Sequence, residues 1–204
     1  MRYSVQNRFF LLRKDFFSTL KTHKWGVVSG AFLLVVGVAL GIFIGSDVGE
    51  KEAPFGMFAS LFGLDYSPFG YLMPDFLRFL FFSALCSLAF FFPAPMLYPA
   101  VALIFFGKYF GEAAYVCFLS DPLIPASLNI ILIHIPLLLM GGAMLISVTI
   151  KARYSRIECG ADICLKSIKR HMFYLLTLLL AYFMILLLLY VAICGVIYLV
   201  MIAL

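Results

Sequence analysis

Charged residues are scarce in this chain of 204 residues: 12% are Asp, Glu, Lys or Arg. Hydrophobic residues (Ala, Val, Ile, Leu, Met, Phe, Trp, Tyr and Cys) make up 65%. A soluble domain has about 25% charged and about 45–50% apolar residues. The mean hydropathy is +1.10. This composition indicates an integral membrane protein. It excludes a disordered chain, a collagen-like repeat and a disulfide-rich secreted scaffold.

Catalytic and nucleotide-binding motifs are also lacking. The sequence has no Gly-x-x-x-x-Gly-Lys phosphate loop, no His-Glu-x-x-His zinc motif and no Gly-x-Ser-x-Gly nucleophile elbow. It has only three histidines, and two of them, His23 and His171, lie at basic edges of apolar segments. We therefore expect a protein that is not an enzyme and that binds no metal and no cofactor.

Cysteine is too sparse for a disulfide framework. Three of the five cysteines lie within apolar runs, where they pack as small hydrophobic residues. Cys159 and Cys164 fall in a basic segment, and together with His171 they could form a metal site. Their spacing does not match the close Cys-x-x-Cys pairs of zinc sites, and no fourth ligand is evident. A structural role is therefore the better interpretation.

The charges that are present are unevenly placed. Six of the fifteen Lys and Arg residues lie in 1–24 and six in 151–171, whereas 46–75 holds five acidic residues and a single lysine. Basic segments stay on the cytoplasmic side of a membrane and are attracted to anionic lipid. We expect inner-surface lipid contacts from Arg13, Lys14, Lys151, Arg153, Lys169 and Arg170. Nucleic-acid binding is not expected, because it would require a larger exposed surface.

Apolar runs long enough to cross a bilayer define the architecture, since about 20 helical residues span its hydrocarbon core. The spans are expected at about 25–45, 76–92, 100–119, 126–150 and 172–200. The fold class is therefore all-α: a polytopic bundle of five transmembrane helices with interfacial amphipathic helices. Residues 25–204 form one transmembrane domain in the plasma membrane, with the N-terminus cytoplasmic and the C-terminus outside.

The first 24 residues form a separate cytoplasmic segment that alternates basic and aromatic residues. Spacings of three or four residues place Phe9, Leu12, Phe16 and Leu20 on one helical face. Two interpretations are open: a basic helix that lies in the inner membrane interface, or a helix that packs against neighbouring protein. The second basic segment, 151–171, has a similar pattern and is expected to form an inner-interface helix.

Glycines recur at four-residue spacing in two of the expected spans. This small-xxx-small pattern lets a second helix approach closely in a membrane. The positions expected to pack helices are Gly26, Gly30, Gly37, Gly41, Gly107 and Gly111. Glycine this frequent in a span indicates packing and not catalysis.

Ionisable residues inside a span are costly and therefore mark functional candidates. Lys108 and Glu112 stand four residues apart, on one helical face. They are expected to form an ion pair that faces the bundle interior; a polar or proton-coupled pocket and a contact to a partner membrane protein are the alternatives. Asn129 and His134 follow in the next span. His134 precedes Pro136 by two residues and is expected to bond to Glu112 or a freed carbonyl, or to be a satisfied structural histidine.

The central segment, residues 76–150, carries a resemblance. A proline-containing break precedes FFGKYFGEAAYVCFL, and PASLNIILIHIPLLLMGGAML follows a short turn. These features resemble the stage II sporulation protein M family of small bacterial membrane proteins. Lys108, Glu112 and His134 depart from the family pattern. The resemblance implies a non-enzymatic scaffold that, in endospore formers, works in engulfment with a lytic transglycosylase and an amidase that thin peptidoglycan.

These observations predict a non-catalytic integral membrane scaffold. Its partners are expected to be the lipid bilayer and other membrane proteins, and the resemblance suggests peptidoglycan hydrolases among them. Assembly of the chain with copies of itself, as a homo-oligomer, is a further open alternative. The alternative is a membrane transport component, either a permease-like subunit or a small-solute carrier, that uses Lys108, Glu112 and His134.

Overall fold

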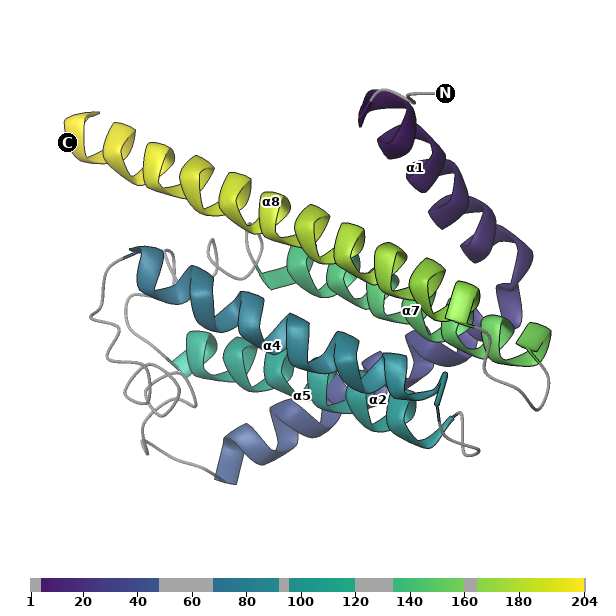
Figure 1. Cartoon of the computed structure of the whole chain (residues 1–204). Helices are drawn as coiled ribbons and strands as arrows, with labels where there is room; N and C mark the ends of the chain where they lie inside the picture. Colours follow the sequence, from purple (N-terminus) through teal and green to yellow (C-terminus); the bar gives the residue numbers. More distant parts are fainter. Residues whose placement is uncertain (1–4, 48–67, 92–95, 120–133, 160–164, 204) are drawn as a thin grey trace.

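The computed structural model describes residues 5–47, 68–91, 96–119, 134–159 and 165–203, and side chains within 13–44, 73–91, 96–115, 134–157 and 165–192. All regular secondary structure in these ranges is helical (Figure 1). The helices are α1 (Val5–Thr22), α2 (Lys24–Asp47), α4 (Pro68–Leu88), α5 (Leu97–Leu119), α7 (Ile135–Cys159) and α8 (Leu165–Ala203). The predicted all-α class is confirmed.

Three segments of the described helices are long and apolar enough to cross a membrane: Lys24–Ile44, Ile135–Ile157 and Leu165–Ala192. They correspond to the spans expected at 25–45, 126–150 and 172–200, and they are compatible with a multi-pass membrane protein. The other two expected spans correspond to α4 and α5. Each of these helices contains a pair of opposite charges, and neither meets the same criterion of length and hydropathy over its described residues.

The helix bounds differ from the expected ones mainly at the basic ends. Helix α7 continues past residue 150 to Cys159, and α8 begins at Leu165, before the expected residue 172. The prediction of a separate interfacial helix over 151–171 is therefore wrong. Residues 151–159 belong to the end of α7, and residues 165–171 belong to the start of α8. No proline or glycine lies between Gly142 and Gly160, so nothing in the sequence ends α7 at the membrane surface.

The helices alternate in direction around α7, which contacts α1, α2, α4, α5 and α8. The pairs Gly26–Ile150 and Gly30–Ile146 show that α2 and α7 are antiparallel. In contrast, α2 and α5 run in the same direction, and α2 crosses the other helices obliquely in Figure 1. The start of α2, the start of α5, the end of α7 and the start of α8 consequently share one end of the bundle.

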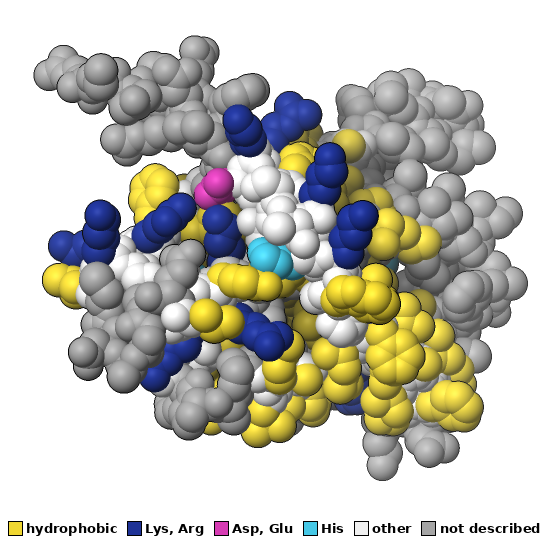
Figure 2. Space-filling view, turned by 90° about the vertical axis from the view of Figure 1, so that its right-hand side faces the viewer, with side chains coloured by type: hydrophobic (Ala, Val, Ile, Leu, Met, Phe, Trp, Pro, Cys, Tyr) yellow, Lys and Arg dark blue, Asp and Glu magenta, His cyan; other side chains and the backbone are white. Residues whose placement is uncertain are grey.

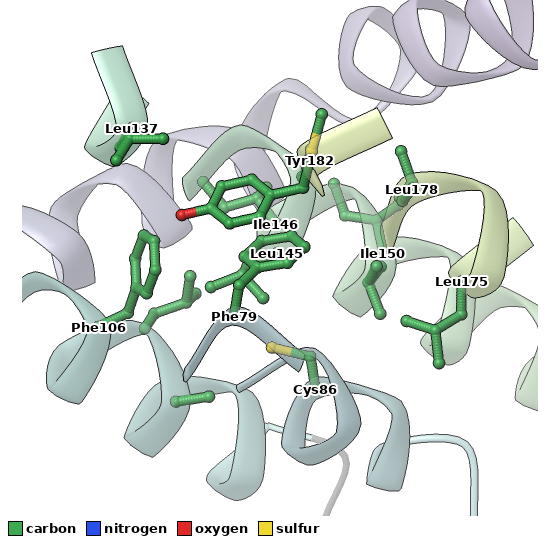
Figure 3. Close-up of a cluster of buried hydrophobic side chains, with 14 of the residues drawn as sticks. Phe79, Cys86, Phe106, Leu137, Leu145, Ile146, Ile150, Leu175, Leu178 and Tyr182 are labelled. Carbon is green, nitrogen blue, oxygen red and sulfur yellow. The ribbon is translucent and has the colours of Figure 1, made fainter. Parts of the chain in front are cut away.

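Aromatic side chains fill the interior where α4, α5, α7 and α8 meet (Figure 3). The rings of Phe79 and Tyr182 are stacked with centroids 3.7 Å apart, and Phe106 meets Phe79 edge to face at 6.4 Å. Leu145 and Leu186 are fully buried beside them. Because lipid tails are as apolar as these side chains, close van der Waals packing holds such a bundle together.

Helix α1 is fixed to the bundle on one side. Phe16 and Leu20 pack against the core cluster, and Asp15 accepts a hydrogen bond of 3.1 Å from Lys151 of α7. Phe17, next to Phe16, is exposed. One face of α1 therefore packs against neighbouring protein, which is one of the two interpretations of this segment. The exposed ring of Phe17 leaves an apolar side chain on another face.

Candidate functional site

The glycines of α2 and α5 bring the two backbones into direct contact. A Cβ atom added to Gly37 would lie 2.2 Å from the carbonyl oxygen of Ile104, and one added to Gly41 would lie 2.1 Å from that of Lys108. From the opposite helix, a Cβ at Gly111 would lie 2.2 Å from the carbonyl oxygen of Val38. A Cβ added to Gly107 would lie 2.3 Å from the carbonyl oxygen of Leu34. Any side chain at these four positions would separate the helices.

The remaining two glycines of the predicted set face α7 and not α5. A Cβ at Gly30 would lie 2.6 Å from Cγ1 of Ile146, and one at Gly26 would lie 3.3 Å from Cγ1 of Ile150. These neighbours are side-chain atoms, which can give way more easily than backbone. All six predicted glycines thus lie at contacts within this chain.

Lys108 and Glu112 form an ion pair of 2.8 Å beside the glycine contact. Their side chains retain 27% and 16% of their exposure. The backbone of the same two residues touches Gly41, so the close approach of α2 occurs at the turn of α5 that carries the charges. An ion pair partly removed from water needs good geometry to compensate for desolvation, and the i,i+4 spacing supplies it.

A second polar cluster, which sequence analysis missed, lies between α4, α5 and α8. Asp75, 8% exposed, accepts hydrogen bonds from Arg78 at 3.0 Å, from the hydroxyl of Tyr109 at 3.2 Å and from the hydroxyl of Tyr190 at 3.0 Å. The guanidinium carbon of Arg78 lies 3.9 Å from the centroid of the Tyr109 ring. Both oxygens of a buried carboxylate are thereby satisfied, and three helices are joined at one point.

Arg78 is directed into the bundle and not toward the membrane surface. Its side chain is only 10% exposed and pairs with Asp75, which was expected to belong to the acidic segment 46–75. Because α4 begins at Pro68, both residues lie well within the helix. Their i,i+3 spacing was the available sequence signal. The tyrosines, in contrast, stand in apolar runs that gave no indication of their partner.

His134 lies immediately before α7 and beside Phe110 of α5. Its ring meets Phe110 edge to face at 6.1 Å, and it lies within electrostatic range of Asp75, whereas Glu112 pairs with Lys108. Asn129 lies outside the described residues. Lys108 and Glu112 are thus brought together, as predicted.

His171 is a further buried group, 3% exposed, at the basic end. Its ring is stacked on Phe90 with centroids 5.7 Å apart, and neither ring nitrogen has a hydrogen-bond partner among the described residues. The side chains of Cys159 and Cys164, considered with it as metal ligands, lie outside the described part. Within the described residues, no group of three or more His, Cys, Asp or Glu side chains is placed to hold a metal.

Basic side chains gather at the end of the bundle where α2 begins and α7 ends (Figure 2). Of the residues expected to contact lipid, Arg13, Lys14, Arg153, Lys169 and Arg170 are exposed, and Lys151 is half-buried beside Asp15. This end also contains a cavity of about 430 Å³ between α2, α5 and α7. Lys108, Glu112 and His134 are not among the described residues that line it.

Comparison of the chain with models of known protein families, with curated proteins and with solved structures finds no match in any of the three.

Proposed function

We propose that the protein is a non-catalytic integral membrane scaffold that holds partner proteins at the cell membrane. In this proposal α2, α4, α5, α7 and α8 all cross the bilayer. Alternating directions and a shared core support five crossings, because α4 and α5 pack between helices that are themselves long enough to span. The basic end is cytoplasmic, which places the N-terminus inside and the C-terminus outside.

The observation that carries the proposal is the pairing of charges inside the bundle. Among the described side chains, those charged away from the basic end form two pairs, Lys108 with Glu112 and Arg78 with Asp75. A proton-coupled site or a general acid–base catalyst uses an ionisable group that exchanges a proton or a partner. Two charges already paired with each other support a structural role instead, and Asp75 also joins α4 to Tyr109 of α5 and Tyr190 of α8.

The surfaces that remain for partners are the outward faces of the bundle. All six predicted glycines contact this chain's own helices, so their faces are not available to other proteins. Helix α2 is the most peripheral of the three candidate spans: 17% of its most apolar window is buried, against 61% for α7. The acidic segment 46–75 lies largely outside the described residues.

The class of partner is proposed from the resemblance of residues 76–150 to the stage II sporulation protein M family. Wall-remodelling enzymes, such as peptidoglycan hydrolases, are accordingly the first partners to seek. Neither the two ion pairs nor the glycine contact distinguishes these enzymes from other membrane proteins, so this part of the proposal rests on the sequence resemblance alone.

Recovery of partners from membranes tests the scaffold. The tagged protein is cross-linked in cells, extracted in mild detergent and compared with Lys108→Met/Glu112→Gln, which replaces both charges by uncharged side chains of similar size. A scaffold should retain the same co-purifying membrane proteins in both forms, in fixed proportion to the tagged chain. Recovery of the wild-type protein alone would contradict the proposal.

The transport alternative requires Lys108, Glu112 and His134 to act on a solute together. The direct pairing of Lys108 with Glu112, which neutralises both charges, does not favour it. Solute uptake or export that depends on this protein in vesicles, and that Glu112→Gln abolishes, would establish the alternative and refute the scaffold.

A further inference from the structure

The cavity at the basic end combines an apolar floor with a basic mouth. Its floor is formed by side chains of three helices, among them Leu103 of α5 and Ile146 and Ile150 of α7, all of which are buried. At about 430 Å³ it falls within the range of about 300–1,000 Å³ that small-molecule sites occupy.

The mouth of the cavity carries two cations. Lys24, at the first residue of α2, and Arg153 of α7 both line it and are exposed. Neither forms an ion pair with a described residue, and no described acidic side chain lines the cavity. Their charge is therefore available to an anion.

Aromatic residues mark the depth of the mouth in a membrane. Trp25 is 87% exposed at the cavity, and the ring of His23 is stacked on that of Tyr154 with centroids 3.9 Å apart. Trp and Tyr concentrate at the level of lipid headgroups, and the buried floor extends from there toward the middle of α7. The cavity thus spans the boundary between headgroup and acyl chain.

We infer that this cavity binds one anionic phospholipid of the inner leaflet. Lys24 and Arg153 hold the phosphate, and an acyl chain lies against Leu103, Ile146 and Ile150. Charge complementarity selects this occupant, because the ammonium group of a zwitterionic lipid would add a third cation to a mouth that already has two. The inner leaflet is also where anionic lipids attract basic segments. The inference concerns a ligand site and does not depend on the scaffold function.

The chain's single tryptophan makes the site directly observable. Brominated phospholipids quench tryptophan fluorescence on contact. The full-length protein is reconstituted in phosphatidylcholine vesicles that contain, as a minor component, either brominated phosphatidylglycerol or brominated phosphatidylcholine. Trp25 should be quenched more strongly by the anionic lipid at equal mole fraction, and the quenching should saturate.

Variants separate a discrete site from diffuse attraction to a basic surface. Each basic residue near an anionic surface contributes about fivefold in binding, so Lys24→Gln/Arg153→Gln should lower the preference for phosphatidylglycerol by about 25-fold. The matched control, Lys166→Gln/Lys169→Gln, removes two charges from α8 that do not line the cavity and should retain the preference. Ser29→Phe, at an exposed position of the lining, should block the site without a change of charge.

Native mass spectrometry of the same proteins gives the stoichiometry, which should be one phosphatidylglycerol retained by the wild type and none by Ser29→Phe. Equal quenching by the two lipids, or an equal loss in the α8 control, would overturn the inference. Quenching that instead falls as protein concentration rises would assign the cavity to a second copy of the chain and would also overturn it.

Discussion

The backbone contact between α2 and α5 makes Gly41→Ala the substitution with the clearest consequence. The added methyl group would lie 2.1 Å from the carbonyl oxygen of Lys108 and 2.9 Å from Cα of Gly111. Both neighbours are backbone atoms and cannot move by changing rotamer. To reach the ordinary contact distance of 3.4 Å, the helices must separate by about 1.3 Å.

The size of the effect follows from that displacement. Forcing an extra methyl group into a packed interior costs about 1–3 kcal/mol, and here the separation also loosens the contacts at Gly37, Gly107 and Gly111. For a chain of this size, 1 kcal/mol shifts the midpoint of thermal unfolding, Tm, by about 2–4 °C. We therefore expect Gly41→Ala to lower Tm by about 2–12 °C. Because one displacement relieves all four contacts, Gly41→Ala/Gly111→Ala should cost less than the two single changes together.

Thermal unfolding of the purified protein in one detergent measures the effect. Gly26→Ala is the matched control, since it adds the same methyl group to the same helix at 3.3 Å from the side chain of Ile150, which can shift. It should lower Tm by no more than about 2 °C. If Gly41→Ala unfolds at the same temperature as Gly26→Ala, the two backbones are not in contact and the reasoning fails.

Three further predictions concern polar groups, and thermal unfolding measures each. Asp75→Asn should cost about 3–5 kcal/mol, because it removes the carboxylate that pairs with the buried guanidinium of Arg78; a cost under about 1 kcal/mol would show that the pair is solvated. His171→Phe should raise stability by about 1 kcal/mol, because it removes two buried nitrogens that have no hydrogen-bond partner among the described residues, and a loss of stability would refute that account of the site. Lys151→Gln should cost less than about 1 kcal/mol, since its pair with Asp15 is partly exposed, and a larger cost would mean that this pair holds α1 in place.

The sequence predicted the elements whose signals are local. Helix α2 lies within two residues of its expected bounds, because one long apolar run separates a lysine from an aspartate. The Lys108–Glu112 pair was expected from i,i+4 spacing alone, and the structure contains it. The four-residue glycine spacing indicated a close helix contact, although it did not identify which glycines meet.

Features that depend on tertiary neighbours could not be predicted in this way. The hydroxyl of Tyr190 reaches Asp75 across 115 positions of sequence, and no periodicity encodes such a contact. The cavity lies between three helices, and its basic mouth combines Lys24 of α2 with Arg153 of α7. Sequence analysis assigned Arg153 to lipid contact but did not bring the two residues together. The end of α7 was placed too early because hydropathy locates the membrane boundary, whereas a helix continues until its backbone meets a breaker.

Complementation by the charge-neutral pair is the most direct test of the central claim that the paired charges within the bundle have a structural role and do not act on a solute. A strain that lacks the protein is supplied with Lys108→Met/Glu112→Gln, with single Lys108→Met as the variant that leaves one charge unpaired. Replacing both members of a buried ion pair by side chains of similar volume is often neutral for stability, whereas removing one is costly. The account predicts full complementation by the double variant and reduced protein level with the single one. A double variant that accumulates and folds normally yet fails to complement would contradict the account.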